Sequence, residues 1–143
     1  GVAAPLYWES GETDREFKFN NYLNRYHARH LDLMDILAGY QARAFSSLEE
    51  VALMLGLPGK MGMSGARVWE HFREGQISDI RAYCETDVLN TYLVYLHFEK
   101  MRGLLSETAF SHEKQRLIEF LEAADQDHLQ EFLSQLLDGT GSA

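Results

Sequence analysis

The chain has 143 residues, of which 45% are hydrophobic, and it carries a formal net charge of −9. This composition suits one domain with a hydrophobic core and excludes a disordered chain. No apolar run is long enough to cross a bilayer, and no basic-then-apolar leader is present, so we expect no membrane contact. The single cysteine, Cys84, cannot form an internal disulfide, which favours a reducing, cytoplasmic setting.

Acidic residues are concentrated near the C-terminus. From Ser106 onward, eight acidic residues accompany only two basic ones, Lys114 and Arg116. A negative protein is a poor partner for nucleic acid, because phosphate backbones are bound chiefly by Lys and Arg. A metal-dependent nuclease is an exception, since its bound ions offset both the acidic ligands and the phosphate. Because most of the excess negative charge lies in this tail, the residues before Ser106 are less unfavourable to nucleic acid than the total charge indicates.

The first part of the chain has weak patterns. Residues 1–18 show no sustained period, so we expect an irregular arm or loop. Between Tyr22 and Tyr40 the pattern is ambiguous, and we favour a short strand or extended segment near His30 to Asp32, followed by a helix. Asp35 suits the N-terminus of that helix, where a carboxylate faces the helix dipole. The role of Asp32 stays open.

The sequence predicts that a helix begins after Ser47. Ser47 and Glu50 form a capping box, and the helix that follows should stop at Gly56. The glycine-rich segment 59–65 comes next and lacks the residue order of a nucleotide-binding Walker A loop. It is either a simple flexible turn or a loop beside the active site, with Lys60 contacting a phosphate.

The remainder is predicted to be helical, so the fold class expected for residues 47–137 is mainly α. Four helices are expected in turn, over residues 64–75, 77–101, 107–123 and 127–137. Gly103 should end the second of these helices, and Gly139 should close the last.

Tyr83 and Asp87 are the residues on the long helix that could carry chemistry. At helical pitch, side chains four residues apart lie one above the other on the same face. A carboxylate is a hard oxygen ligand for Mg²⁺ or Mn²⁺, and a neighbouring phenol can position a water or a scissile phosphate. This spacing also occurs in ordinary boundary pairs, so spacing alone does not decide between the two interpretations.

The surrounding sequence favours the chemical interpretation. The run from Tyr83 to Leu93 resembles the third motif, Tyr-x-x-x-Asp, of the DEDDy 3′-to-5′ exonucleases. The segments 30–35 and 55–60 are similar to a bacterial branch of predicted exonucleases related to the proofreading domain of B-family DNA polymerases. The resemblance covers roughly residues 7–103. It implies a ribonuclease H-like α/β fold and a site for two Mg²⁺ or Mn²⁺ ions. The implied substrate is the 3′ end of a single-stranded nucleic acid, with DNA expected before RNA.

Only part of the family's acidic site matches this chain. Members hold the two ions with four acidic side chains, from an Asp-x-Glu motif on an early strand, a second-motif Asp and the third-motif Asp. The letters of the first motif occur at residues 14–16, but they lie in a polar stretch without a strand pattern. The resemblance therefore carries over Tyr83 as a catalytic residue that orients water and Asp87 as a catalytic metal ligand, while Asp32 and Asp35 are not among the four ligands.

We therefore expect residues 1–103 to be the C-terminal part of a 3′-to-5′ exonuclease domain, and residues 104–143 to be an acidic helical tail that packs on it. On this interpretation the isolated chain has little or no nuclease activity. The alternative is a non-catalytic helical protein-interaction module, in which Tyr83 and Asp87 are boundary residues and the acidic tail binds a protein. The sequence does not decide between DNA and RNA, because the sugar is recognised through contacts that this chain does not identify.

Overall fold

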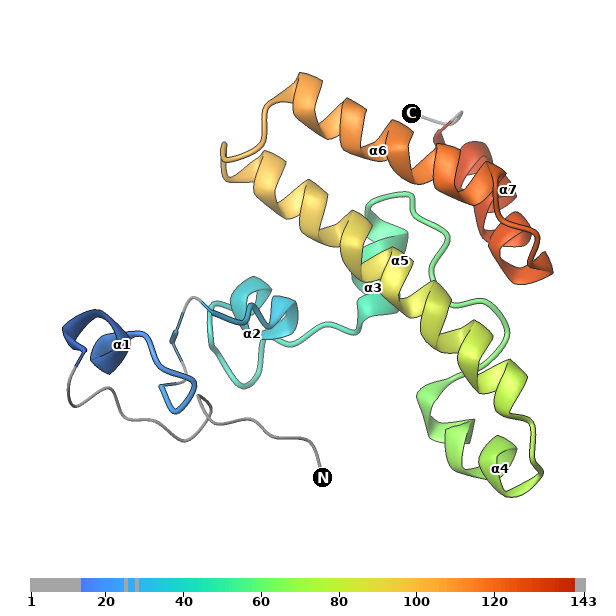
Figure 1. The fold of residues 1–143 in the computed structure, drawn as a ribbon, viewed down its shortest axis with the longest axis horizontal. Helices are drawn as coiled ribbons and strands as arrows, with labels where there is room; N and C mark the ends of the chain where they lie inside the picture. The colour runs from blue at the N-terminus through green and yellow to red at the C-terminus, as the bar shows by residue number, and fades with distance from the viewer. Residues whose placement is uncertain (1–13, 25, 28, 141–143) are drawn as a thin grey trace. The chain divides into compact units, whose positions relative to one another are not determined.

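A computed structural model describes residues 14–24, 26–27 and 29–140 of the chain. The chain divides between Ala44 and Phe45 into two compact units. The first carries α1 (Arg15–Phe19) and α2 (Leu33–Leu37). The second carries α3 (Leu48–Met54), η2 (Gly65–Arg67), α4 (Val68–Arg73), α5 (Ile77–Met101), α6 (Glu107–Glu122) and α7 (Asp127–Thr140) (Figure 1). The described residues contain helices and no strand, which confirms the mainly α prediction for this part of the chain.

The first unit begins with a short capped helix. The side chain of Asp14 accepts hydrogen bonds from the backbone N–H groups of Glu16 at 2.9 Å and Phe17 at 3.2 Å. The prediction of an irregular arm through Lys18 is therefore wrong for residues 15–18, and residues 1–13 lie outside the described part. The helix was missed because a cap can stabilise one turn that is too short to show a period.

Asp32 has a similar capping role at α2. Its backbone is extended, with φ −84° and ψ 107°, and its side chain accepts from the N–H groups of Met34 and Asp35. This confirms an extended segment followed by a helix, and it answers the question that the sequence left open for Asp32. Asp35 lies in the first turn, where its charge faces the helix dipole as expected.

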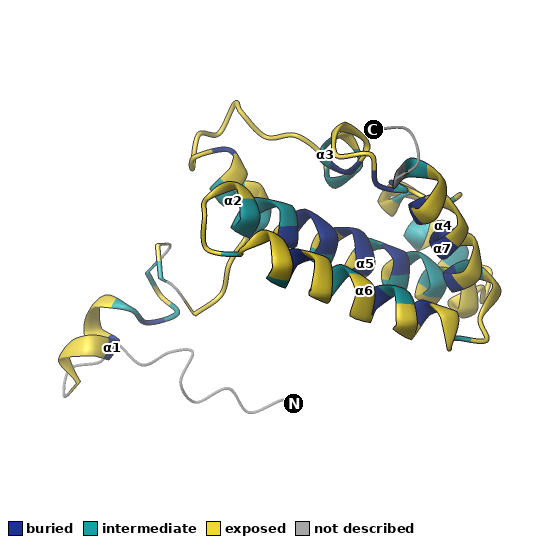
Figure 2. Ribbon diagram, turned by 90° about the horizontal axis from the view of Figure 1, so that it is seen from above, coloured by how far each residue is buried: buried dark blue, intermediate teal, exposed yellow. Residues whose placement is uncertain are grey.

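The second unit is built around α5. This helix packs against α3, α4, α6 and α7, and α6 also packs against α7. Figure 2 shows the buried stripe that follows α5 toward its C-terminal half. The buried residues on α5 are Thr86, Leu89, Asn90, Leu93, Val94 and Leu96. Because Tyr83 and Asp87 lie at the beginning of this stripe, the packing of α5 determines where their side chains are held.

The predicted start of α3 is confirmed in detail. Ser47 Oγ accepts from the Glu50 N–H at 3.2 Å, and Glu50 Oε2 accepts from the Ser47 N–H at 2.7 Å. The long helix also has the predicted limits, with Gly75 before it and Gly103 after it in left-handed backbone conformations. None of the helices in the described part of the chain is long and apolar enough to cross a bilayer.

The predicted end of the last helix is wrong. α7 continues through Gly139 to Thr140 instead of stopping before Gly139. A Cβ built on Gly139 would overlap the carbonyl oxygen of Gly56, which follows α3. The glycine therefore permits a close approach of two backbones, a requirement that a helix-stop rule does not consider.

Candidate functional site

The structure places Tyr83 and Asp87 together on α5. Both side chains are half-buried, and the Asp87 carboxylate is close enough to the Tyr83 hydroxyl to act as its hydrogen-bond acceptor and raise its pKa. The helical spacing therefore produces the side-by-side pair that the sequence predicted. Because a carboxylate only accepts hydrogen bonds, the phenol is the donor in this contact.

The surroundings of Tyr83 raise the pKa of its hydroxyl. Burial raises the pKa of Tyr83 to about 12, and the hydrogen bond to Asp87 and the Asp87 charge act in the same direction. The nearby backbone of Gly65 has the opposite, smaller effect on the pKa. At neutral pH the phenol is neutral, as an ordinary tyrosine is, and can donate a hydrogen bond.

The glycine-rich segment 59–65 reaches this pair. A Cβ built on Gly65 would lie 3.5 Å from the Tyr83 hydroxyl oxygen, so the loop backbone is in contact with the phenol. At the other end of the loop, the Gly59 carbonyl accepts from Asn90 Nδ2 at 2.7 Å. The loop is thus hydrogen-bonded to α5 at its beginning and in contact with Tyr83 at its end.

Lys60 occupies a different place from the one predicted by that interpretation. Its Nζ atom lies 3.3 Å from Glu49 Oε2, and the ion pair is largely exposed to solvent. Lys60 is also not among the residues that line the cavity next to Tyr83. In this arrangement the lysine pairs with α3, and the structure does not bring it to Tyr83 and Asp87.

The cavity next to Tyr83 has a volume of about 270 Å³ and is lined by both polar and apolar groups. The loop, α4, α5 and α7 all contribute to it. Its residues are Met61, Gly62, Met63, Arg67, His71, Asp79, Ala82, Tyr83, Thr86, His128 and Glu131. Both ring nitrogens of His71 are buried without a hydrogen-bond partner in the described part of the chain, and Nδ1 lies 3.9 Å from Asp79 Oδ2.

The donor set for a metal ion is incomplete here. Within residues 14–140, apart from positions 25 and 28, no group of three or more His, Cys, Asp or Glu side chains could hold an ion. Asp87 provides one carboxylate of the type that Mg²⁺ and Mn²⁺ prefer. Asp14 and Glu16 belong to the capped start of α1 and not to a strand. The described residues therefore do not by themselves form a complete site for two metal ions.

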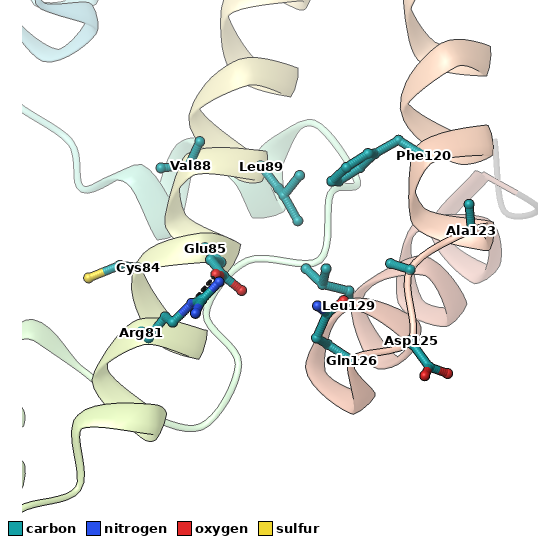
Figure 3. Close-up of a pocket in the computed structure, with 11 residues that line it drawn as sticks. Arg81, Cys84, Glu85, Val88, Leu89, Phe120, Ala123, Asp125, Gln126 and Leu129 are labelled. Carbon is teal, nitrogen blue, oxygen red and sulfur yellow. Dashed lines mark hydrogen bonds and ion pairs between the residues drawn. The ribbon is translucent and has the colours of Figure 1, made fainter.

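A second, larger cavity lies between α5 and the junction of α6 with α7 (Figure 3). Its volume is about 750 Å³, and Val88, Leu89, Phe120 and Leu129 give it apolar walls. Figure 3 shows Arg81 and Glu85 bonded to each other at its edge.

Glu85 also joins two helices at this edge. Arg81 Nε lies 2.6 Å from Glu85 Oε1, and His128 Nε2 lies 2.6 Å from Glu85 Oε2. The hydrogen bond from Arg81, followed by that from His128, lowers the pKa of Glu85. Sequence reasoning missed this contact, because His128 is 43 residues from Glu85 and Glu85 is a variable position of the Tyr-x-x-x-Asp motif.

Asn90 is the other site residue that sequence reasoning missed. It is a polar residue in the buried stripe of α5, with only 2% of its surface exposed. That exception to the apolar pattern was the available signal, because a buried amide requires a hydrogen-bond partner. The partner itself, Gly59, is 31 residues away and is not indicated by the pattern.

Comparison with known proteins identifies the family. The model of a family described as a predicted 3′–5′ exonuclease related to the exonuclease domain of PolB matches residues 1–136. No curated protein and no solved structure matches the chain. The match extends over both units, and it confirms the resemblance drawn from the segments around residues 30, 55 and 83. The chain therefore belongs to the family of predicted 3′–5′ exonucleases related to the exonuclease domain of PolB.

Proposed function

We propose that this chain provides the third motif of a metal-dependent 3′-to-5′ exonuclease that hydrolyses terminal phosphodiesters of single-stranded nucleic acid, with DNA as the first substrate to test. Tyr83 and Asp87 are its catalytic residues. The other acidic ligands come from sequence outside these 143 residues. The observation that carries the proposal is the contact between the Tyr83 hydroxyl and the Asp87 carboxylate on α5.

Each residue has a definite role in this proposal. The Asp87 carboxylate would hold one of two Mg²⁺ or Mn²⁺ ions, which activate water and offset the phosphate charge when bound. The phenol oxygen of Tyr83, whose O–H points to Asp87, accepts a hydrogen bond from the attacking water and so orients it. Asp87 in turn fixes the direction of the phenol O–H, so the two side chains act as a unit.

The rest of the domain is proposed on the same basis. Residues 1–103 form the C-terminal part of a ribonuclease H-like exonuclease domain that acts in the cytoplasm, and residues 104–143 are a tail that packs on it. The packing of α6 and α7 against α5 supports this role for the tail. Lys60 remains a proposed phosphate contact, which requires that its ion pair with Glu49 opens when nucleic acid binds.

The first experiment compares the chain alone with a longer protein that contains the first two motifs. A labelled single strand is incubated with each protein and Mg²⁺ or Mn²⁺. The 143-residue chain should release almost no mononucleotide, because one carboxylate does not form a two-ion site. Robust digestion by the chain, lost in Asp87→Ala, would show that the other ligands had been assigned to the wrong place.

The second experiment tests the two residues in the longer protein. Asp87→Asn keeps the shape and removes the charge, so turnover should be almost abolished and metal binding weakened. Tyr83→Phe removes only the hydroxyl, so the rate should fall on the order of ten- to a thousandfold with folding intact. Cys84→Ser and Val88→Ala are matched controls, since both residues are exposed neighbours of the pair on α5. Parental rates in both test variants would favour the helical interaction module instead.

A further inference from the structure

Asn90 is a polar residue among the mostly apolar buried residues of α5. It is 2% exposed, and its Oδ1 atom has no hydrogen-bond partner in the described part of the chain. Its one strong contact is the bond from Nδ2 to the Gly59 carbonyl, at 2.7 Å. Because burying an amide costs free energy, a leucine would satisfy a purely packing role better. The bond to Gly59 is what distinguishes Asn90 from a leucine at this site.

The bond fixes the beginning of the glycine loop. Gly59 is buried and has φ +68°, and a Cβ there would lie 3.2 Å from Leu53 Cδ2. Met63, later in the loop, is also buried. At the end of the loop, the Gly65 backbone lies against the Tyr83 hydroxyl, because a Cβ built on Gly65 would be 3.5 Å from the phenol oxygen. A single segment of backbone therefore connects the Asn90 amide to the Tyr83 hydroxyl.

We propose that Asn90 is a positioning residue for Tyr83: its bond to Gly59 holds the glycine loop against α5, so that the Gly65 backbone keeps the phenol oxygen in place. The inference rests on the proposed catalytic role of Tyr83. Asp87 directs the phenol O–H from one side, and the Gly65 backbone limits the movement of the phenol oxygen from the other. Asn90 controls the second contact without touching the phenol.

The test uses nuclear magnetic resonance of the 143-residue chain with labelled tyrosine and backbone amides. Asn90→Leu keeps the branching of the side chain and removes the donor. Leu96→Val is the matched control, because Leu96 is also buried on α5 but has no polar side-chain atom that could bond to the loop. Tyr83→Phe assigns the Tyr83 ring signal and shows the Gly65 amide signal without its phenol partner.

In Asn90→Leu the Gly65 amide signal should move toward its position in Tyr83→Phe, and its hydrogen exchange should accelerate by up to about tenfold, the factor that one lost hydrogen bond permits. The Tyr83 ring signal should move as well. Leu96→Val should leave both signals near their parental positions. If Asn90→Leu does not fold by circular dichroism, Asn90→Ala serves the same purpose. Gly65 and Tyr83 signals that are unchanged in a folded Asn90 variant would overturn the proposal.

Activity of the longer protein separates this inference from the function on which it rests. Asn90→Leu should lower kcat about tenfold because the loop orients the hydroxyl, and it should change KM less, since Lys60 is the one loop residue proposed to contact the strand. An unchanged kcat in Asn90→Leu, together with a reduced kcat in Tyr83→Phe, would refute only the role of Asn90. Parental kcat in Tyr83→Phe and Asp87→Asn would refute the proposed function, while the resonance signals would still report on the loop.

Discussion

The ionisation of Tyr83 gives a direct measure of its contact with Asp87. The pKa of this phenol is raised from its ordinary value of 10.0 to about 12, first by burial and then by the hydrogen bond and charge of Asp87. At pH 11 such a group is about one-tenth ionised, whereas a phenol with the ordinary pKa is about nine-tenths ionised. Asp87→Asn removes the charge but not the burial, so its Tyr83 pKa should fall between these two values.

The measurement is a pH titration of the ring signal of Tyr83 in protein with carbon-labelled tyrosine. The parental chain should titrate latest, Asp87→Asn earlier, and Asp87→Ala earlier still, because alanine also removes the hydrogen-bond acceptor. The raised pKa implies that Tyr83 stabilises the fold fully below pH 10.0, and that this contribution is lost as the pH rises toward about 12. A parental midpoint near the ordinary value, or identical midpoints in all three proteins, would refute the contact described here.

Three further predictions concern stability, each measured by urea unfolding followed by circular dichroism. Leu93→Ala should lower the free energy of unfolding by about 2–5 kcal/mol because Leu93 is fully buried, whereas Val88→Ala, at a position 67% exposed, should change it by less than about 0.5 kcal/mol. Gly139→Ala should cost about 1–3 kcal/mol, since its Cβ would overlap the Gly56 carbonyl, and a neutral result would contradict the close backbone approach. The lowered pKa of Glu85 means that its contribution is present above pH 4.5 and is lost below it, so Glu85→Gln should be less sensitive to acid than the parental chain; equal acid sensitivity would exclude that linkage.

Local sequence rules were sufficient wherever the relevant contact lies within one or two helical turns. Ser47 and Glu50 are three residues apart, so the capping box could be predicted and was confirmed. The pairing of Tyr83 with Asp87 follows from helical pitch in the same way. The catalytic role of Tyr83 and Asp87 remains a prediction.

Tertiary structure decided the contacts that join distant parts of the chain. The bond from Asn90 to Gly59 spans 31 residues, and the contact of His128 with Glu85 spans 43. Periodicity specifies which face of a helix is buried, but it does not specify which backbone carbonyl or carboxylate comes to meet that face. Gly139 illustrates the same limit: the sequence rule treated it as a helix stop, whereas its lack of a side chain allows α7 to lie against Gly56. Such requirements exist only once two segments pack together, because they arise from the space and the hydrogen-bond partners that the neighbouring segment provides.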